Sequence, residues 1–261
     1  MKHNSLTLLL AAGMLLAGMQ TAKAQKVVLH MAGNQTFECS ISQLDSITFV
    51  GDDLIIEEEH EWVDLGLPSG TLWATCNVGA KSPEEYGDYF AWGETEPKSE
   101  YNWSTYKYCM GEYNTMTKYC HQIDYGYNGF TDNLTELEPA DDAATANWGI
   151  GWQMPSLAQL QELVNKDYTK TEWMTLDGVN GKKITSNVNG KSIFLPAAGM
   201  RYDTKLDYTG SFGDYWSRSL TTYDSSYANG MTFNSSSIIY WEDHLSRYRG
   251  KCVRPVRVKT R

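Results

Sequence analysis

The sequence predicts an α+β fold with two helices followed by an antiparallel meander, preceded by a small N-terminal β unit. Only two segments of the chain have a helical pattern of apolar residues. The C-terminal part alternates apolar and polar residues with a period of two, which is typical of antiparallel strands with one buried face. Elsewhere, short strand-like runs are separated by Gly, Asn and Ser turns.

Residues 1–24 have the pattern of a secretory signal peptide. Lys2-His3 precedes an apolar run at 6–19, and the small-residue site Ala22-Lys23-Ala24 follows. A helix needs about 20 apolar residues to cross a bilayer, so this run is too short for a membrane anchor. We expect cleavage before Gln25 and export to the periplasm, the cell surface or the medium, without membrane insertion of the mature chain.

The chain carries an excess of acidic residues. It has 22 Lys and Arg against 32 Asp and Glu, a net charge of −10, and loss of residues 1–24 removes two lysines and no acid, which makes −12. Such a surface repels phosphate backbones, so we expect no nucleic-acid partner. The 17 Tyr and 9 Trp predict a core, and part of a surface, that are rich in aromatic rings.

Residues 25–56 are expected to form a small β segment and a linker. Strands are predicted at 26–30 and 46–50, with a turn at Gly33-Asn34 between them. About 25 residues bury too little surface to fold alone, so this unit would dock on its neighbour, pair with another chain or remain a flexible leader. The acidic segment 57–61, at the start of the main domain 57–261, is expected to be a solvated linker.

Two helices are expected in the main domain. The first is predicted over 139–148, where Asp141 and Asp142 favour the N-terminal end and three alanines favour the helix itself. The second is predicted over 155–164, because Ser156 and Gln159 can form a capping box. Its apolar stripe, expected to face the core, consists of Leu157, Leu160, Leu163 and Val164. The intervening residues 95–137 have poor periodicity and are expected to form a long ordered insertion.

Four strands of a C-terminal meander are predicted at 214–219, 227–233, 237–243 and 250–258. Their residues and connecting loops combine aromatic and polar side chains, the chemistry that serves antibody loops. The alternative interpretation is an ordinary sheet surface rich in Tyr and Thr. The candidate ligand-binding residues are Tyr223, Asp224, Tyr227, Asn229, Tyr240, Trp241, Asp243 and Tyr248, with His244 among them in the sequence.

Five cysteines leave at least one thiol unpaired. The best candidate disulfide joins Cys109 to Cys120, because similar segments flank a possible hairpin centred on Asn114-Thr115. Such a bridge would stabilise the fold by about 3 kcal/mol, and two free thiols are the alternative. The other cysteines, expected to be small apolar residues in or near a core, are Cys39, Cys76 and Cys252.

No catalytic motif is found in the sequence, and no cofactor or metal site is expected. The four histidines after residue 24 have no metal-ligand spacing, and nucleophile-elbow, Cys-x-x-Cys and phosphate-loop motifs are absent. A pair of carboxylates of the glycosidase type is left open by residue counts alone. Two segments are faintly similar to a lectin calcium site, 138–140 and 241–243, but both lack the amide ligand.

Six motifs occur in one order and together cover most of the chain from residue 62 to 258. They are WVDLGLPSGTLWA at 62–74, YGDYFAWGE at 86–94, GWQMPS at 151–156, LPAAG at 195–199, YWS at 215–217 and VRPV at 253–256. Together they resemble the Fibrobacter succinogenes major paralogous domain group of exported bacterial proteins, many of them from gut Bacteroidetes. The segment 44–49, LDSITF, is also similar to a leader found in such proteins.

The resemblance implies a C-type-lectin-like fold, in which two helices pack on a twisted antiparallel sheet. That fold is shared with formylglycine-generating enzymes and with proteins that retroelements diversify. The resemblance also implies that the C-terminal meander is the displayed surface. Formylglycine-generating enzymes need two reactive cysteines near the C-terminus, whereas this chain has Cys252 alone there. That departure argues against oxidase activity.

The leading hypothesis is therefore an exported, non-catalytic module that binds a protein or a glycan through the meander. A second hypothesis is a structural or adhesive component of a cell-surface assembly, with the β segment pairing with another subunit's sheet edge. A formylglycine-generating or glycosidase-like enzyme is the weaker alternative. Targeted diversification of residues 215–248 is a further, weaker idea.

Overall fold

The computed structural model describes residues 26–31, 35–40, 60–149, 151–241 and 246–258. The chain divides into two compact units, residues 1–56 and 57–261. In the first unit, β1 (Lys26–Met31) pairs antiparallel with β2 (Gln35–Ser40). The strand predicted at 26–30 is confirmed, but its partner is a strand that the sequence analysis did not predict. The predicted turn and the predicted strand at 46–50 lie outside the described residues.

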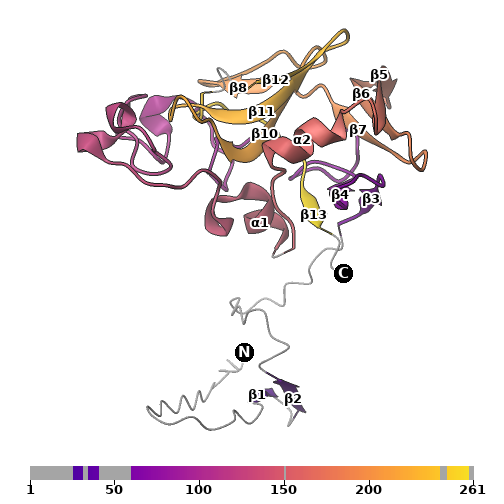
Figure 1. Cartoon of the computed structure of the whole chain (residues 1–261), viewed down its shortest axis with the longest axis horizontal. Coiled ribbons are helices and arrows are strands. Elements are labelled where there is room, and N and C mark those ends of the chain that lie inside the picture. Colours follow the sequence, from indigo (N-terminus) through magenta and orange to yellow (C-terminus); the bar gives the residue numbers. More distant parts are fainter. Residues whose placement is uncertain (1–25, 32–34, 41–59, 150, 242–245, 259–261) are drawn as a thin grey trace, which may run out of the picture. The chain divides into compact units, whose positions relative to one another are not determined.

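The larger unit is an α+β structure with few helices and several small antiparallel sheets (Figure 1). One sheet has the order β13-β4-β3 and joins the two ends of the unit. Its strands are β3 (Trp62–Asp64), β4 (Thr71–Ala74) and β13 (Val256–Val258). A second sheet consists of β5 (Thr169–Leu176), β6 (Val179–Ser186) and β7 (Ser192–Pro196). A two-stranded hairpin consists of β8 (Met200–Tyr202) and β9 (Lys205–Asp207).

The third sheet contains the predicted meander with three strands rather than four. It consists of β10 (Gly213–Leu220), β11 (Ala228–Phe233) and β12 (Ile238–Trp241), each antiparallel to the next. The predicted fourth strand is wrong, because residues 250–256 are buried and bridge to Phe90, Gln153, Arg201 and Tyr215 instead. β13 then pairs with β4. Residues 250–256 therefore run through the interior and do not display an outer face.

The two predicted helices are present, and the second follows the prediction closely. α2 (Leu157–Leu163) begins with the expected capping box, in which the Ser156 hydroxyl accepts from the Gln159 amide and the Gln159 side chain accepts from the Ser156 amide. Figure 1 shows α2 lying along β10 and β11. The first helix is divided into a 3-10 turn, η5 (Pro139–Asp141), and α1 (Ala143–Trp148). Asp142 causes the division, since it is the N-cap of α1 and its carboxylate accepts two helix amides.

The core of the larger unit is aromatic, as the composition predicts. Two buried indoles link β10 to the segment before the insertion: Trp92 donates to the Ser217 carbonyl, and Trp216 donates to the Phe90 carbonyl, both at 2.8 Å. Buried ring N–H groups need such partners, and each pair also buries a large apolar surface. Because these bonds join residues more than 120 positions apart, they fix where the insertion leaves the core.

Candidate functional site

The predicted insertion folds as turns and a short hairpin around one buried cation, Arg247. Its guanidinium donates to the Tyr106 hydroxyl at 2.8 Å and to the carbonyls of Lys118, Tyr119 and Ser225 at 2.9–3.1 Å. It also lies over the rings of Trp92 and Tyr106, with centroids 4.9 and 5.2 Å away. Two loops are thus attached to one side chain, because Lys118 and Tyr119 belong to the insertion and Ser225 to the β10–β11 loop.

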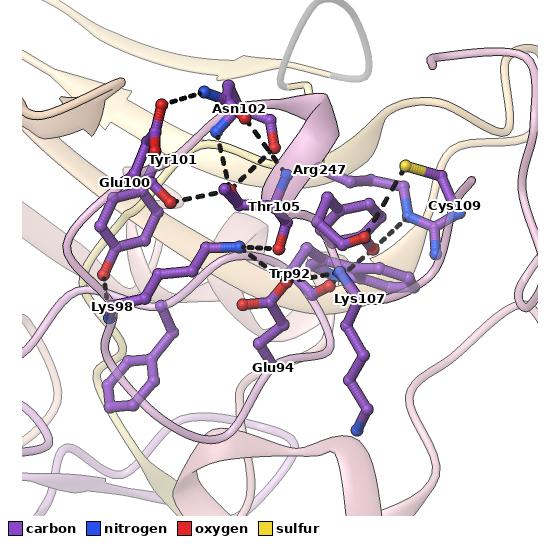
Figure 2. Close-up of polar contacts among 12 residues, drawn as sticks. Trp92, Glu94, Lys98, Glu100, Tyr101, Asn102, Thr105, Lys107, Cys109 and Arg247 are labelled. Atoms are coloured by element: carbon purple, nitrogen blue, oxygen red, sulfur yellow. Dashed lines mark hydrogen bonds and ion pairs between the residues drawn. The ribbon is translucent and has the colours of Figure 1, made fainter. Parts of the chain in front are cut away.

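The start of the insertion is anchored by Glu94, the last residue of the second sequence motif. Figure 2 shows the Lys98 ammonium between the Glu94 carboxylate and the Thr105 carbonyl, at 2.9 Å from each. Glu94 also accepts from the backbone amide of Lys107 at 2.8 Å. Asn102 and Thr105 form a capping box around the 3-10 turn η2 (Trp103–Thr105), which places the Trp103 ring. These bonds give the insertion a fixed entry.

Asp141 holds the middle of the insertion against the 3-10 turn before α1. Its carboxylate accepts from the hydroxyls of Tyr108 and Tyr119 and, at 2.6 Å, from the Lys118 ammonium. Burial alone would raise the pKa of this carboxyl, but the hydrogen bonds, that from Lys118 first, more than offset it and lower the pKa below its ordinary value. The ionised form of Asp141 is therefore part of the folded structure.

The insertion also binds the loop between β10 and β11 that carries three of the candidate residues. The Gln122 side chain donates to the Tyr223 carbonyl at 2.7 Å and accepts from the Ser225 amide at 3.0 Å. The Tyr125 hydroxyl donates to the Asp224 carboxylate at 2.8 Å, and the other oxygen of Asp224 accepts from the amide and hydroxyl of Ser226. The hydrogen bond to Asp224 is the main cause that raises the pKa of Tyr125 to about 12. The loop therefore has a defined shape.

A pocket of about 330 Å³ lies between these two loops, and we call it the aromatic pocket. Its lining residues are Trp103, Tyr113, Asp224, Ser226, Tyr227 and Ser246. Tyr113 is 52% exposed and meets the ring of Tyr125 edge-on at 6.2 Å. The pocket thus combines ring faces, one carboxylate and hydroxyl groups, all of which suit a polar ligand with apolar C–H surfaces.

Some of the candidate residues predicted from the sequence lie at the aromatic pocket or on the surface beside it, and others are buried. Asp224 and Tyr227 line the aromatic pocket, and Tyr223 is 40% exposed on the same loop. Asn229 and Tyr248 were wrongly placed on the surface by the sequence, since both are buried. Asn229 donates to the Leu220 carbonyl at 2.9 Å, and Tyr248 packs edge-on against Trp103 at 4.8 Å.

The other candidates cannot be placed on a face. Tyr240 and Trp241 belong to β12, but their side chains, and the whole of Asp243 and His244, lie outside the described residues. Sequence reasoning missed Trp103, Tyr113 and Tyr125, which come from the insertion. The density of Tyr and Trp between 101 and 130 was the signal that could have found them, because a solvated loop has little use for so many rings.

The predicted disulfide is wrong, since Cys109 and Cys120 are both free thiols. Cys109 bridges to Met116, because the Thr115 hydroxyl accepts from the amides of Met110 and Glu112 and closes the turn earlier than expected. Cys120 lies beyond the hairpin. Burial raises the pKa of both thiols, as it does for Cys76 and Cys252. The side chain of Cys39 lies outside the described residues.

Among the residues that the structure describes, no group of three or more His, Cys, Asp or Glu could hold a metal ion. His60, expected in a solvated linker, instead stacks on Trp148 with ring centroids 3.6 Å apart. Glu138, part of the faint calcium pattern, forms an ion pair with Lys118. None of the helices in the described part of the chain is long and apolar enough to span a membrane.

Comparison of the chain with protein-family models, with curated proteins and with solved structures gives no match in any of the three.

Proposed function

We propose that the chain is an exported, non-catalytic binding module that holds a glycan or protein ligand in the aromatic pocket. The observation that carries this proposal is the architecture of the pocket. Two separate loops are fixed by buried and partly buried hydrogen bonds, while Tyr113 stays exposed in the pocket lining and Tyr223 stays exposed on the adjacent β10–β11 loop. Fixed loops that present exposed rings lose little conformational entropy on binding.

The chemistry of the pocket favours a saccharide over a protein side chain. Trp103 and Tyr113 offer ring faces for the C–H surfaces of a sugar, and Asp224 and Ser226 offer partners for its hydroxyls. The Asp224 carboxylate already accepts three hydrogen bonds, but a carboxylate has about four acceptor positions. A volume of about 330 Å³ is at the lower end of ligand pockets and matches one sugar ring rather than a chain.

A C-type-lectin-like fold of the Fibrobacter succinogenes group is part of the proposal. It is supported by two short helices beside antiparallel sheets and by the way the six motifs come together. Each motif contributes buried residues to the core, among them Trp73, Phe90, Met154, Ala198, Trp216 and Val253. Segments far apart in sequence that share one core are what such a domain requires.

The burial of Cys252 supports the non-catalytic part of the proposal. Cys252, the only cysteine near the C-terminus, is fully buried, and burial strongly raises the pKa of its thiol. The reactive form of cysteine is the thiolate, so this thiol is inert in the folded protein. Buried residues also cover it, which leaves a substrate no access.

The test is a glycan-array screen of the protein lacking residues 1–24, with and without calcium, followed by variants. Tyr113→Ala combined with Tyr223→Ala should weaken binding to a captured glycan by about tenfold or more, because each lost stacking ring contributes about 1 kcal/mol. Tyr208→Ala is the matched control, since Tyr208 is also an exposed tyrosine, at 56%, but lies between β9 and β10, on neither of the two loops that form the pocket. Binding that the double variant leaves unchanged would place the ligand elsewhere. Capture of a protein but of no glycan would show a protein receptor.

A second candidate function is a structural component of an assembly, and β1 and β2 favour it. A two-stranded sheet is marginally stable by itself, so it gains by adding to the sheet edge of another chain. Deleting residues 25–56 should then abolish assembly, measured by light scattering, and leave glycan binding intact. If the deletion leaves the oligomeric state unchanged, this function is wrong.

A further inference from the structure

A second pocket, of about 610 Å³, lies where the C-terminal end of α2, the sheet of β5 and β6, and the turn between β11 and β12 meet. We call it the lysine pocket. Three ammonium groups line it, from Lys166, Lys170 and Lys182, and no carboxylate does. Five hydroxyl or amide side chains complete the polar lining: Thr169, Thr171, Asn187, Ser236 and Ser237. In a chain with a net charge of −10, this is a local basic and hydroxyl-rich surface.

Lys182 is the unusual member of this pocket. It lies on β6 opposite Trp173 of β5 and Leu195 of β7, on the face that also carries the buried Ile184. Only 5% of its surface is exposed, and among the described residues no hydrogen bond or ion pair of its ammonium is found; the nitrogen itself opens to the water of the pocket. Burial, with no opposing charge, lowers its pKa. Lys251, also a buried lysine, differs because Asp214 pairs with it at 3.1 Å.

Burying most of a lysine side chain without a partner for its ammonium costs some stability, so an apolar residue would suit this position better unless something binds there. A ligand anion would supply the missing partner. Lys166 and Lys170 are exposed at the same pocket and would add attraction for an anion without being desolvated. The hydroxyl and amide groups would meet a ligand that carries several hydroxyls of its own.

We propose that the lysine pocket binds an acidic saccharide, with its carboxylate or sulfate on the Lys182 ammonium and its hydroxyls on the Thr, Ser and Asn side chains. The pocket volume is within the range of small-ligand sites, about 300–1,000 Å³, and holds one or two sugar rings. The absence of an aromatic side chain from the lining separates this chemistry from that of the aromatic pocket. The proposal stands on its own and does not depend on the function assigned to that pocket.

The test uses titration calorimetry with four probes: sodium glucuronate, glucose 6-sulfate, glucose and inorganic sulfate. We expect the two acidic sugars to bind at least about tenfold more tightly than glucose or sulfate. Lys182→Met should weaken their binding by about tenfold or more, since it keeps the length of the side chain and removes its charge. Lys183→Met is the matched control, because Lys183 is the next residue of β6, faces the opposite side of the sheet and is absent from the lining. Its affinity should stay within about twofold of the wild type.

Two further measurements separate a lost ligand contact from a damaged fold. Lys182→Met should unfold at a higher temperature than the wild type without ligand, because it removes a buried unpaired charge. Thr171→Val should weaken the acidic sugars and leave sulfate unchanged. The proposal is overturned if neither acidic sugar binds the wild type, if Lys182→Met binds them as the wild type does, or if sulfate binds as tightly as glucose 6-sulfate. The Tyr113→Ala and Tyr223→Ala double variant should bind glucuronate normally, so failure of one site is distinguishable from failure of the other.

Discussion

Replacing Arg247 with methionine removes the side chain that joins the insertion to the β10–β11 loop. Methionine fills a similar volume and keeps the apolar contact with Trp92 and Tyr106, but it provides no donor. Four oxygen acceptors then lose a partner, the Tyr106 hydroxyl and the carbonyls of Lys118, Tyr119 and Ser225, and so does the weaker acceptor Met116 Sδ. Two of these carbonyls belong to one loop and one to the other, so the substitution tests both the stability of the fold and the shape of the aromatic pocket.

The expected cost follows from the number of buried acceptors that lose their donor. An unsatisfied buried acceptor costs about 1–3 kcal/mol, and four would sum to more than is observed for single substitutions. Water can reach the Lys118 carbonyl, which is only partly buried, and removing the guanidinium also removes the cost of burying its charge. We therefore expect a loss of about 3–5 kcal/mol in the free energy of unfolding, close to that for breaking a buried ionic network.

Urea unfolding followed by tryptophan fluorescence measures this loss. Arg218→Met is the control, because Arg218 pairs with Glu136 near the surface and donates to one partly buried carbonyl, that of Met154, so its loss should cost at most about 2 kcal/mol. Arg247→Met should also weaken ligand binding in the aromatic pocket, since the Ser225 carbonyl is released. A loss for Arg247→Met no larger than that for Arg218→Met would refute the reasoning that the guanidinium holds the loops.

Three further predictions concern titrating groups. Cys109 and Cys120 should react with a thiol reagent only after unfolding, and dithiothreitol should leave the melting temperature unchanged; a lower melting temperature would reveal a disulfide. The stability that ionised Asp141 contributes is fully present above 3.8, the pKa of this carboxyl in the unfolded chain, and is lost as pH falls through its lower pKa in the folded protein. Asp141→Asn should therefore lower the free energy of unfolding at neutral pH and make it depend less steeply on pH in acid. Burial lowers the pKa of Lys182 in the folded protein below 10.5, its value in the unfolded chain, so the cost of its charge is fully present below the folded pKa and is lost as pH rises towards 10.5. The gain in melting temperature from Lys182→Met should therefore shrink at high pH. A gain that does not change with pH contradicts this.

Local sequence signals predicted the elements that depend on local interactions. The capping box of Ser156 and Gln159 involves residues three positions apart, and α2 begins where it predicts. The period-two pattern of β10 to β12 is likewise contained within each strand, and all three strands are found where expected. The α+β class follows from these elements together.

The faces of the meander could not be predicted, because they depend on an irregularity between strands. Trp216 pairs with Gly230 and Leu220 pairs with Ala228, so three residues of β10 lie opposite the single residue Asn229. Such a bulge leaves backbone groups without a ladder partner, and the Asn229 side chain turns inward to donate to the Leu220 carbonyl. Nothing in the alternation of β11 alone marks that residue as buried.

The candidate site was predicted only in part for a related reason. Its β10–β11 side was found through Asp224 and Tyr227, but the insertion that forms the other side has no regular periodicity. Its position depends on contacts such as that between Gln122 and Tyr223, 101 residues apart. A pattern within a short window carries no information about a contact of that range, and composition shows only that aromatic residues are abundant there.

The C-terminal segment explains how a unit of small sheets and long loops is held together. Its three buried cations, Arg247, Lys251 and Arg254, point to different parts of the chain. Arg254 donates to the carbonyls of Ala74, Thr75 and Phe194, and Lys251 pairs with Asp214, while Arg247 binds the insertion and the β10–β11 loop. The partners of the two arginines are mostly backbone carbonyls, which every residue type provides. The bonds of these two arginines therefore persist when exposed side chains of the insertion and of the β10–β11 loop change. The bonds of Gln122, Tyr125 and Asp224 do not, because they are made by the side chains themselves. Exchange of contact residues on a constant frame is thus open to exposed positions such as Tyr113 but not to Asp224.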